Sequence, residues 1–351
     1  MQVDKFPLRR LPIDILMNVM KIMDGDQLIS YSLISRTTKQ NVIDLKMKLH
    51  FFTALIGSKL EINLTIPGYY RLLLKFDENK TVNWNPEENE LLRLDNPEIV
   101  EVQCKENHEA EYKESLLLEK RGISVREWIL HLFEIFHYPL MTSFHFFERS
   151  DRFDISFIRK TMEGLNVNRM AFELPLDVCY KLMVEINMFL TRITLNSNDL
   201  APAEYLHKIV IQNAEKTTFN SRTLGLEDTS PFRIDDIMAN NSENILLWCS
   251  VSSDKDLNRF LKLWINGSNP QLKRMVVGYG WGVIKDQLAI MKGISCRVME
   301  KDERRERFLM QAEPWMIAAR HGAFVVRRKD GVEVAVSFFP RWAFMEFTVW
   351  D

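Results

Sequence analysis

The sequence has no long apolar run and few cysteines. No stretch approaches the roughly 18 consecutive apolar residues of a membrane-spanning helix, and the N-terminus lacks the apolar stretch of a signal peptide. The cysteines Cys104, Cys179, Cys249 and Cys296 are scattered and show no metal-binding spacing. This pattern is typical of thiols kept reduced in the cytosol or nucleus. We therefore expect a cytoplasmic or nuclear protein with no membrane partner.

An excess of charge of either sign is also missing. The formal net charge of the 351 residues is −2, so the protein as a whole has no field that would attract nucleic acid or an anionic membrane. The charged run 301–307 alternates in sign and is interpreted as a solvated helix face. The sequence therefore predicts no nucleic-acid partner.

The familiar catalytic motifs are absent as well. The sequence contains no G-x-S-x-G, P-loop, H-E-x-x-H or C-x-x-C motif. His131, Glu134 and His137 are spread over about 120° of a helix, unlike the i, i+4 histidine pair of zinc proteases. The glycine-rich stretch 278–282 lacks the order of a dinucleotide-binding loop and reads as a strand-ending turn. We expect no catalytic residue, metal site or cofactor; an enzyme with an unrecognised site is one alternative.

The sequence does contain three short amphipathic helices before residue 50. Apolar residues recur at three- and four-residue steps over 11–23, and Pro12 stands where the first helix would begin. Asp24 and Gln27 have the spacing of a capping box, and Ser35 can cap the third helix. Because segments below about 40 residues rarely bury enough apolar area to be stable alone, some of this surface should be shared.

The same segment carries a pattern of a known family. It has a Leu11-Pro12 start, an acidic turn over 24–26 and the stretch Leu33 to Arg36. In these features, residues 6 to about 48 resemble an F-box, and more narrowly a nematode-type F-box.

The resemblance implies that the segment docks a Skp-type adaptor and, through it, the cullin scaffold of an SCF ubiquitin ligase. Seven apolar residues would lie against the adaptor: Leu11, Pro12, Ile15, Leu16, Val19, Leu28 and Leu33. The sequence departs from many F-boxes outside nematodes at residues 36–38. The alternative is an ordinary helical hairpin packed on the rest of the chain.

Short strands and a helix are expected next. Residues 60–64 alternate in polarity, Pro67 breaks the pattern, and 70–76 is apolar again. The charged stretch 104–114 has no period and is interpreted as an exposed loop. A capping box at Ser124 predicts a helix that ends before Pro139.

Beyond residue 139 a short apolar pattern recurs about every 23 to 30 residues, close to the period of leucine-rich units. Its six copies begin at Met141, Val167, Leu190, Ala214, Ile245 and Leu272. Helices are expected between the copies, the clearest capped at Ser253 or Asp254, with further helix starts at Pro202 and Pro231. Strand and helix in alternation predict a curved α/β stack with one exposed strand face.

The C-terminal part predicts a β-hairpin. Residues 324–328 and 332–339 flank an Asp330-Gly331 turn, and a third strand is expected over 344–350. Together with the helix 128–137 and the segment 256–272, this hairpin resembles the F-box-associated (type 2) domain of nematode F-box proteins. That resemblance implies that the region binds a target protein.

The repeat geometry predicts which side chains would face the target. They lie between or just after the inward apolar positions, and they are His145, Phe147, Glu173, Asn196, Asn220, Trp248 and Tyr279. Aromatic residues are enriched among interface hot spots. The alternative for Phe147 and Trp248 is that they simply pack under loops.

These observations lead to one prediction of fold and function. The predicted fold class is α+β/α/β. A three-helix F-box is expected at 1–48 and a target-binding region at 49–351. The target-binding region has a β-rich part (49–120), followed by leucine-rich-repeat-like strand-helix repeats that the hairpin closes (121–351). We expect a non-catalytic substrate receptor of an SCF ubiquitin ligase. The alternative is a repeat scaffold that mediates protein–protein interaction without recruiting a ligase.

Overall fold

The structure is a computed structural model of the chain, and it describes part of the 351 residues. Besides the single positions 8, 91, 97, 112 and 238, the described residues are 11–67, 70–77, 99–106, 115–119, 122–186, 192–196, 214–220, 240–248, 253–278, 286–299, 321–339 and 344–350. Several predictions fall outside them: the helix starts at Pro202 and Pro231, the first residue of the copy at Leu190, the charged run 301–307, and the glycine-rich stretch after Gly278, which includes Tyr279. The chain forms two compact units, Met1–Asn168 and Arg169–Asp351, and each is described by itself.

The first unit begins with the three predicted helices. They are α1 (Ile13–Lys21), α2 (Gly25–Ser32) and α3 (Arg36–Asp44). Pro12 directly precedes α1, Asp24 and Gln27 form the predicted capping box of α2, and Ser35 caps α3. The three helix starts predicted from the sequence are therefore confirmed.

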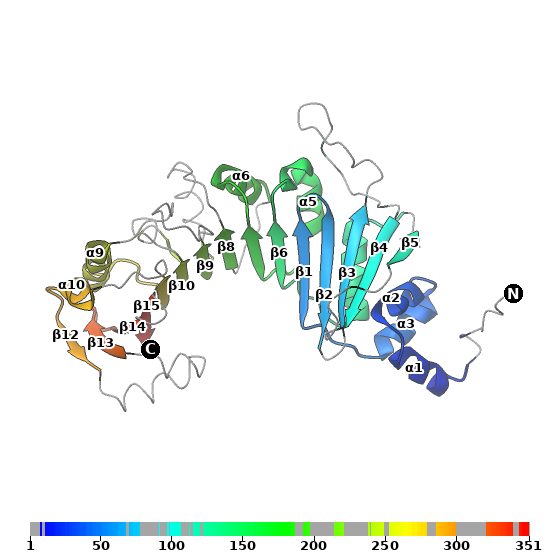
Figure 1. Ribbon diagram of the computed structural model, residues 1–351, viewed down its shortest axis with the longest axis horizontal. Coiled ribbons are helices and arrows are strands. Elements are labelled where there is room, and N and C mark those ends of the chain that lie inside the picture. The colour runs from blue at the N-terminus through cyan, green and yellow to red at the C-terminus, as the bar shows by residue number, and fades with distance from the viewer. Residues whose placement is uncertain are drawn as a thin grey trace. The chain divides into compact units, whose positions relative to one another are not determined.

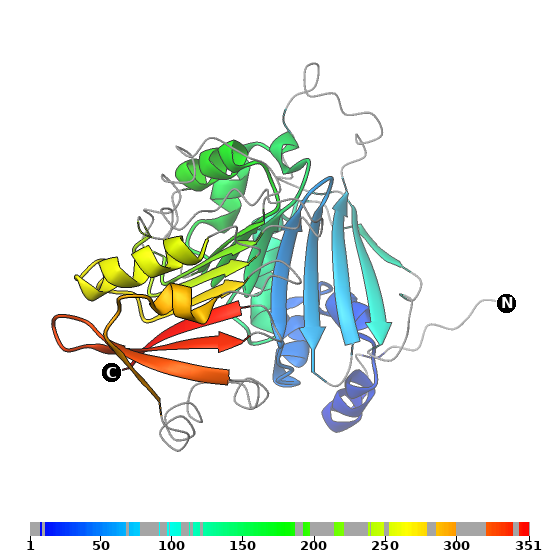
Figure 2. The ribbon, with the colours of Figure 1, turned by 60° about the vertical axis from the view of Figure 1, so that its left-hand side comes forward.

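A mixed six-stranded sheet follows in the first unit (Figure 1). Its strands run in the order β6-β1-β2-β3-β4-β5. They are β1 (Phe51–Ile56), β2 (Leu60–Ile66), β3 (Tyr70–Asp77), β4 (Ile99–Glu106), β5 (Leu116–Glu119) and β6 (Ser143–Phe146). All neighbours pair antiparallel except β1 and β6, which are parallel. Figure 2 shows β1 to β5 in blue to cyan, side by side.

The helix α4 (Val125–Ile135) supplies much of the core of this unit. Ser124 caps it, and the two hydrogen bonds that Ser124 donates to the Glu127 carboxylate lower the pKa of Glu127. Trp128 makes an edge contact with Phe76 of β3, and Phe133 makes one with Phe52 of β1. One face of the sheet is therefore packed against helix. The unit also contains the short helices η2 (Ser150–Arg152) and α5 (Ile155–Met162).

The loop interpretation of the stretch that begins at Cys104 is wrong for its first three residues. Cys104 is buried in β4, on the same face as Val100 and Val102. The charged residues between them point to the other face, so the stretch is an amphipathic strand. The charge of Glu101 and Lys105 concealed the two-residue period.

The second unit combines parallel and antiparallel strands. Its strand order is β12-β13-β14-β15-β11-β10-β9-β8-β7. The parallel strands are β7 (Arg169–Phe172), β8 (Arg192–Asn196), β9 (Lys216–Asn220), β10 (Asn244–Trp248) and β11 (Arg274–Gly278). The antiparallel strands are β12 (Cys296–Val298), β13 (His321–Arg327), β14 (Glu333–Phe339) and β15 (Phe344–Trp350). The helices whose bounds the structure describes in this unit are α6 (Leu176–Ile186), α9 (Asp254–Ile265) and α10 (Gln287–Met291).

The parallel strands pair in the register that the recurring apolar pattern predicts. Met170 lies opposite Ile193, which lies opposite Thr217, and the line continues through Ile245 to Met275. All five side chains are buried. The alignment of the strands is thus confirmed.

The helix predicted after Ser253 or Asp254 and the C-terminal hairpin are also present. Ser253 caps α9, whose Trp264 and Phe260 pack edge-on against Phe347 of β15. In Figure 2 the yellow α9 lies along the strands of this unit. The β13–β14 turn contains Gly331, whose φ is 97°. Glycine adopts such positive φ angles easily, which is why an Asp-Gly pair predicts a tight turn.

Candidate docking site and target-facing residues

The three N-terminal helices form a small packed module. Leu16 and Met20 of α1, Leu28 and Ile29 of α2 and Val42 of α3 are buried. The Ser35 hydroxyl accepts a hydrogen bond from the Thr38 backbone N–H at 3.2 Å, and the Ser35 N–H donates to the Thr38 hydroxyl at 2.9 Å. This reciprocal cap satisfies donors that a helix start leaves unpaired.

Three side chains of α4 and its C-terminal end hold the module in place. His131 Nε2 lies 2.8 Å from the hydroxyl of Ser32, which itself donates to the carbonyl oxygen of Ile29 at 2.6 Å, so the imidazole N–H is the donor to Ser32. Glu134 forms an ion pair with Lys39. His137 Nε2 donates to the carbonyl oxygen of Ile43 at 2.7 Å. These contacts fix α2 and α3 to α4.

The spacing of the same three side chains along one helix argues against a zinc-protease metal site. In the structure, each of them contacts a different residue of the helical module. Among the described residues, no group of three or more His, Cys, Asp or Glu side chains could hold a metal ion.

The module exposes four large apolar side chains. Ile13, Ile15 and Ile22, in or next to α1, are 58%, 49% and 83% exposed, and Ile34, after α2, is 59% exposed. Isolated exposed apolar residues are ordinary, but four within 22 residues are a concentration of apolar surface that a partner could cover.

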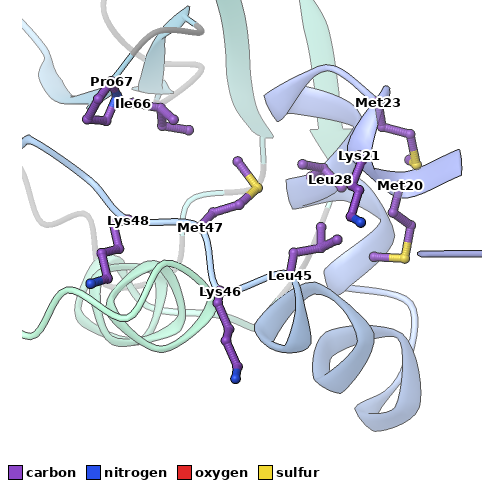
Figure 3. A pocket seen from close by; sticks show the side chains of 10 residues that line it. All are labelled: Met20, Lys21, Met23, Leu28, Leu45, Lys46, Met47, Lys48, Ile66 and Pro67. Atoms are coloured by element: carbon purple, nitrogen blue, oxygen red, sulfur yellow. The ribbon is translucent and has the colours of Figure 1, made fainter. Parts of the chain in front are cut away.

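An apolar pocket of about 440 Å³ lies beside α1 (Figure 3). It is bounded by α1, α2, the segment 45–48 and the turn after β2, and its lining is Met20, Lys21, Met23, Leu28, Leu45, Lys46, Met47, Lys48, Ile66 and Pro67. Met47 points toward the space between Leu28 and Ile66, whereas Lys46 and Lys48 point away (Figure 3). Methionine side chains adapt to irregular partners, so the pocket suits an apolar protein side chain.

The target-facing candidates are distributed over both units. In the first unit, the half-buried His145 stacks on Phe147 with ring centroids 6.0 Å apart, and His145 Nε2 lies 3.0 Å from the Ser143 hydroxyl. Phe147 also lines a second pocket, of about 390 Å³, with Lys59 and Glu61 among its neighbours.

In the second unit, four candidates occupy equivalent strand ends. Glu173 directly follows β7, Asn196 and Asn220 end β8 and β9, and Trp248 ends β10. Their parity places them on the sheet face opposite Met170 and its register partners. Only the backbone of Asn196 and Asn220 is described.

Trp248 is half-buried and packed against its own sheet. Its ring makes an edge contact with Phe344 at 6.3 Å, and a Cβ atom on Gly278 would lie 2.4 Å from its Cε3 atom. The ring therefore depends on the glycine at the end of β11. These contacts are with strand residues and not with a loop, and the Trp248 side chain is only partly buried.

Comparison with protein-family models matches two parts of the chain. The F-box domain model matches residues 8–50, and the F-box associated model matches residues 205–277. This is an F-box protein with an F-box-associated domain. No curated protein and no solved structure shows a significant match.

The F-box match spans α1, α2 and α3. The F-box-associated match includes β9, β10, α9 and β11 as far as Val277. It includes the segment 256–272 on which the sequence resemblance rested, but neither α4 nor the C-terminal hairpin. The part of the chain that the structure describes has no helix of the length and apolarity needed to cross a membrane.

The residues predicted to contact an adaptor differ in how exposed they are. Pro12 and Ile15 are exposed, Leu11, Val19 and Leu33 are half-buried, and Leu16 and Leu28 are buried inside the chain. Leu16 and Leu28 therefore support the docking surface from beneath. The seven predicted adaptor contacts do not include the exposed Ile13, Ile22 and Ile34. Helical periodicity places Ile13 within about 20° of the buried Met20, and Ile22 and Ile34 lie outside the helices, so no helical pattern in the sequence indicates that these three are exposed.

Proposed function

We propose that this protein is the substrate-recognition subunit of an SCF-type ubiquitin ligase. In this proposal the F-box docks a Skp-type adaptor and, through it, a cullin scaffold, while residues 49–351 bind a target protein. The two family matches occur in this order along the chain, which supports the proposal. The other subunits perform ubiquitin transfer, and this chain contributes proximity by making the transfer effectively intramolecular.

The observation that carries the proposal is the set of exposed isoleucines on a rigidly held F-box. Ile13, Ile15 and Ile22 are solvent-exposed although they belong to a module that packs well elsewhere. The hydrogen bonds to α4 orient α2 and α3, so a docked adaptor would be held in a defined orientation relative to the sheet of the first unit.

The repeat architecture is a second part of the proposal. We infer that the strand-helix units of residues 121–351 are leucine-rich-repeat-like and present target-binding residues on one strand face. The matching register of β7 to β11 supports it. The candidates that the structure describes and leaves accessible are His145, Phe147, Glu173 and Trp248. The nematode-type F-box and a cytoplasmic or nuclear location complete the proposal.

Co-purification with a Skp-type adaptor tests the proposed function. Ile15→Asp combined with Ile22→Asp places two charges on the exposed apolar surface, and we expect the adaptor to be lost. Asn18→Asp is the matched control, since Asn18 is an exposed polar residue of α1, and it should retain the adaptor. Failure of the unmodified chain to bind the adaptor, or binding that survives the double substitution, would favour the non-ligase scaffold instead.

A further inference from the structure

Four basic residues stand at the same register position of neighbouring parallel strands. Arg169, Arg192, Lys216 and Arg274 are the first residues of β7, β8, β9 and β11. Arg169 pairs with Arg192 and Arg192 with Lys216; Asn244 of β10 then joins Lys216 to Arg274. Neighbouring strands lie roughly 4.8 Å apart, so this basic row crosses about 19 Å of sheet.

The basic row lies on the face of the sheet that α9 does not cover. Met275 pairs with Phe347, and Phe347 packs against Trp264 and Phe260 of α9. Arg274, one residue before Met275, must point to the other face. The salt bridge from Arg274 to Glu346, the neighbour of Phe347, agrees with this placement.

The row is accessible to a ligand. Arg192 is exposed, and Arg169, Lys216 and Arg274 are half-buried. Two residues further along the same face, Ala171, Thr194 and Val276 are buried. The accessible part of this face is therefore its edge, where the strands begin.

Most of this positive charge has no acidic partner within the described residues. Arg274 Nε lies 2.9 Å from Glu346 Oε1, and the Glu346 side chain is 4% exposed. Arg169 Nε donates to the hydroxyl of Thr194 at 2.9 Å, a neutral partner. In the described part of the chain, no carboxylate pairs with Arg169, Arg192 or Lys216.

The crowding of like charges is unfavourable in the isolated chain. Burial lowers the pKa of Lys216, and the nearby Arg192, Arg274 and Arg169 lower it further. Burial and Arg192 likewise lower the pKa of Arg169. An anionic ligand along the row would relieve this repulsion while forming charge-assisted hydrogen bonds.

The shape of the row favours one kind of anion. A single phosphate concentrates its charge at one point and is best held by cations that converge on it. Here the cations are spread along a line, one per strand, which matches a series of separate carboxylates. Glu346 already shows how a carboxylate is seated on one of them.

We propose that the basic row binds an acidic segment of the target protein, about six extended residues rich in Asp and Glu that run across the strands. This inference names the class of protein that would be the target in the proposed function. It rests on the proposed function only in calling the bound protein a target. Binding of the segment needs no adaptor, so either conclusion can fail while the other holds.

Fluorescence anisotropy of the full-length chain with a labelled hexaglutamate peptide tests the inference. We expect binding that weakens as salt is added, because the contacts are between partly exposed charges. Arg169→Gln, Arg192→Gln and Lys216→Gln together should weaken it at least about tenfold, three ion pairs being lost. The control is Lys181→Gln, Lys255→Gln and Lys292→Gln, which removes the same charge from exposed positions outside the strands and should leave the affinity unchanged.

Three outcomes would overturn the inference. One is an equal loss of affinity in the two triple variants, which would mean that only net charge matters. Another is hexaglutamine binding as well as hexaglutamate. The third is tighter binding of a singly phosphorylated peptide or of oligouridine than of hexaglutamate. Thermal melts of both triple variants establish that they are folded.

Discussion

Lys216 has an unfavourable environment for a charged side chain, because burial and three arginines all disfavour its ammonium group. The lowered folded-state pKa means that this penalty is fully present below that pKa and disappears as the pH rises above 10.5, the ordinary lysine value. At neutral pH the residue therefore reduces stability. Proteins retain such destabilising residues at binding surfaces, where the residue serves function.

Lys216→Met should therefore stabilise the chain. Since Lys216 is only half-buried, solvent screening limits the gain, and we expect about 0.5 kcal/mol in the free energy of unfolding. Lys181→Met on the exposed side of α6 is the control and should change little. Urea unfolding at pH 7 measures both. A loss of stability in Lys216→Met alone would show that the lysine has a favourable partner.

The cysteines should differ strongly in reactivity. Burial raises the pKa of the Cys179 thiol to about 12, and Cys104 is buried in β4, whereas Cys296 is exposed in β12. Because the thiolate is the reactive form, iodoacetamide at neutral pH should modify Cys296 long before the other two. Mass spectrometry of peptides from a labelling time course measures the order. Early modification of Cys179 in the folded protein would contradict its buried position.

At the scale of elements, α4 determines how the F-box is held. The sequence predicted this helix and its cap but could not predict that its histidines face the F-box, since the contacts join residues about 95 positions apart. Spacing along one helix reports which side chains share a face, and it does not report what covers that face.

His131→Ala should be more damaging than Glu134→Gln. His131 bonds to the buried Ser32, and losing that partner should cost about 1 kcal/mol. Glu134 is 56% exposed, so its ion pair with Lys39 should contribute only a few tenths of a kcal/mol. Chemical unfolding of the two variants gives the comparison. Equal losses would mean that the exposed ion pair is as important as the buried hydrogen bond.

The strands also show what local patterns can and cannot predict. The apolar copies aligned β7 to β11 correctly because burial at matching positions fixes register. The basic row cannot be recognised from the sequence, because its four residues are far apart along the chain: Arg169, Arg192, Lys216 and Arg274. Only the parallel register of these strands brings the four cations together.

At the scale of the whole molecule, the chain divides at residue 168 and not at the end of the F-box. The F-box helices share a compact unit with a six-stranded sheet. This arrangement follows from the small size of the F-box, which cannot bury enough apolar area alone. The sequence predicted that its surplus surface is shared. It could not predict that α2 and α3 pack on α4, or which isoleucines stay exposed.

The central claim is that the F-box joins this chain to a cullin scaffold through an adaptor. Retention on an immobilised cullin tests it directly, with and without a purified Skp-type adaptor. We expect the chain and Asn18→Asp to be retained only when the adaptor is present, and Ile15→Asp with Ile22→Asp to be washed away in both cases. Retention without the adaptor, or no retention of the unmodified chain with it, would contradict the account.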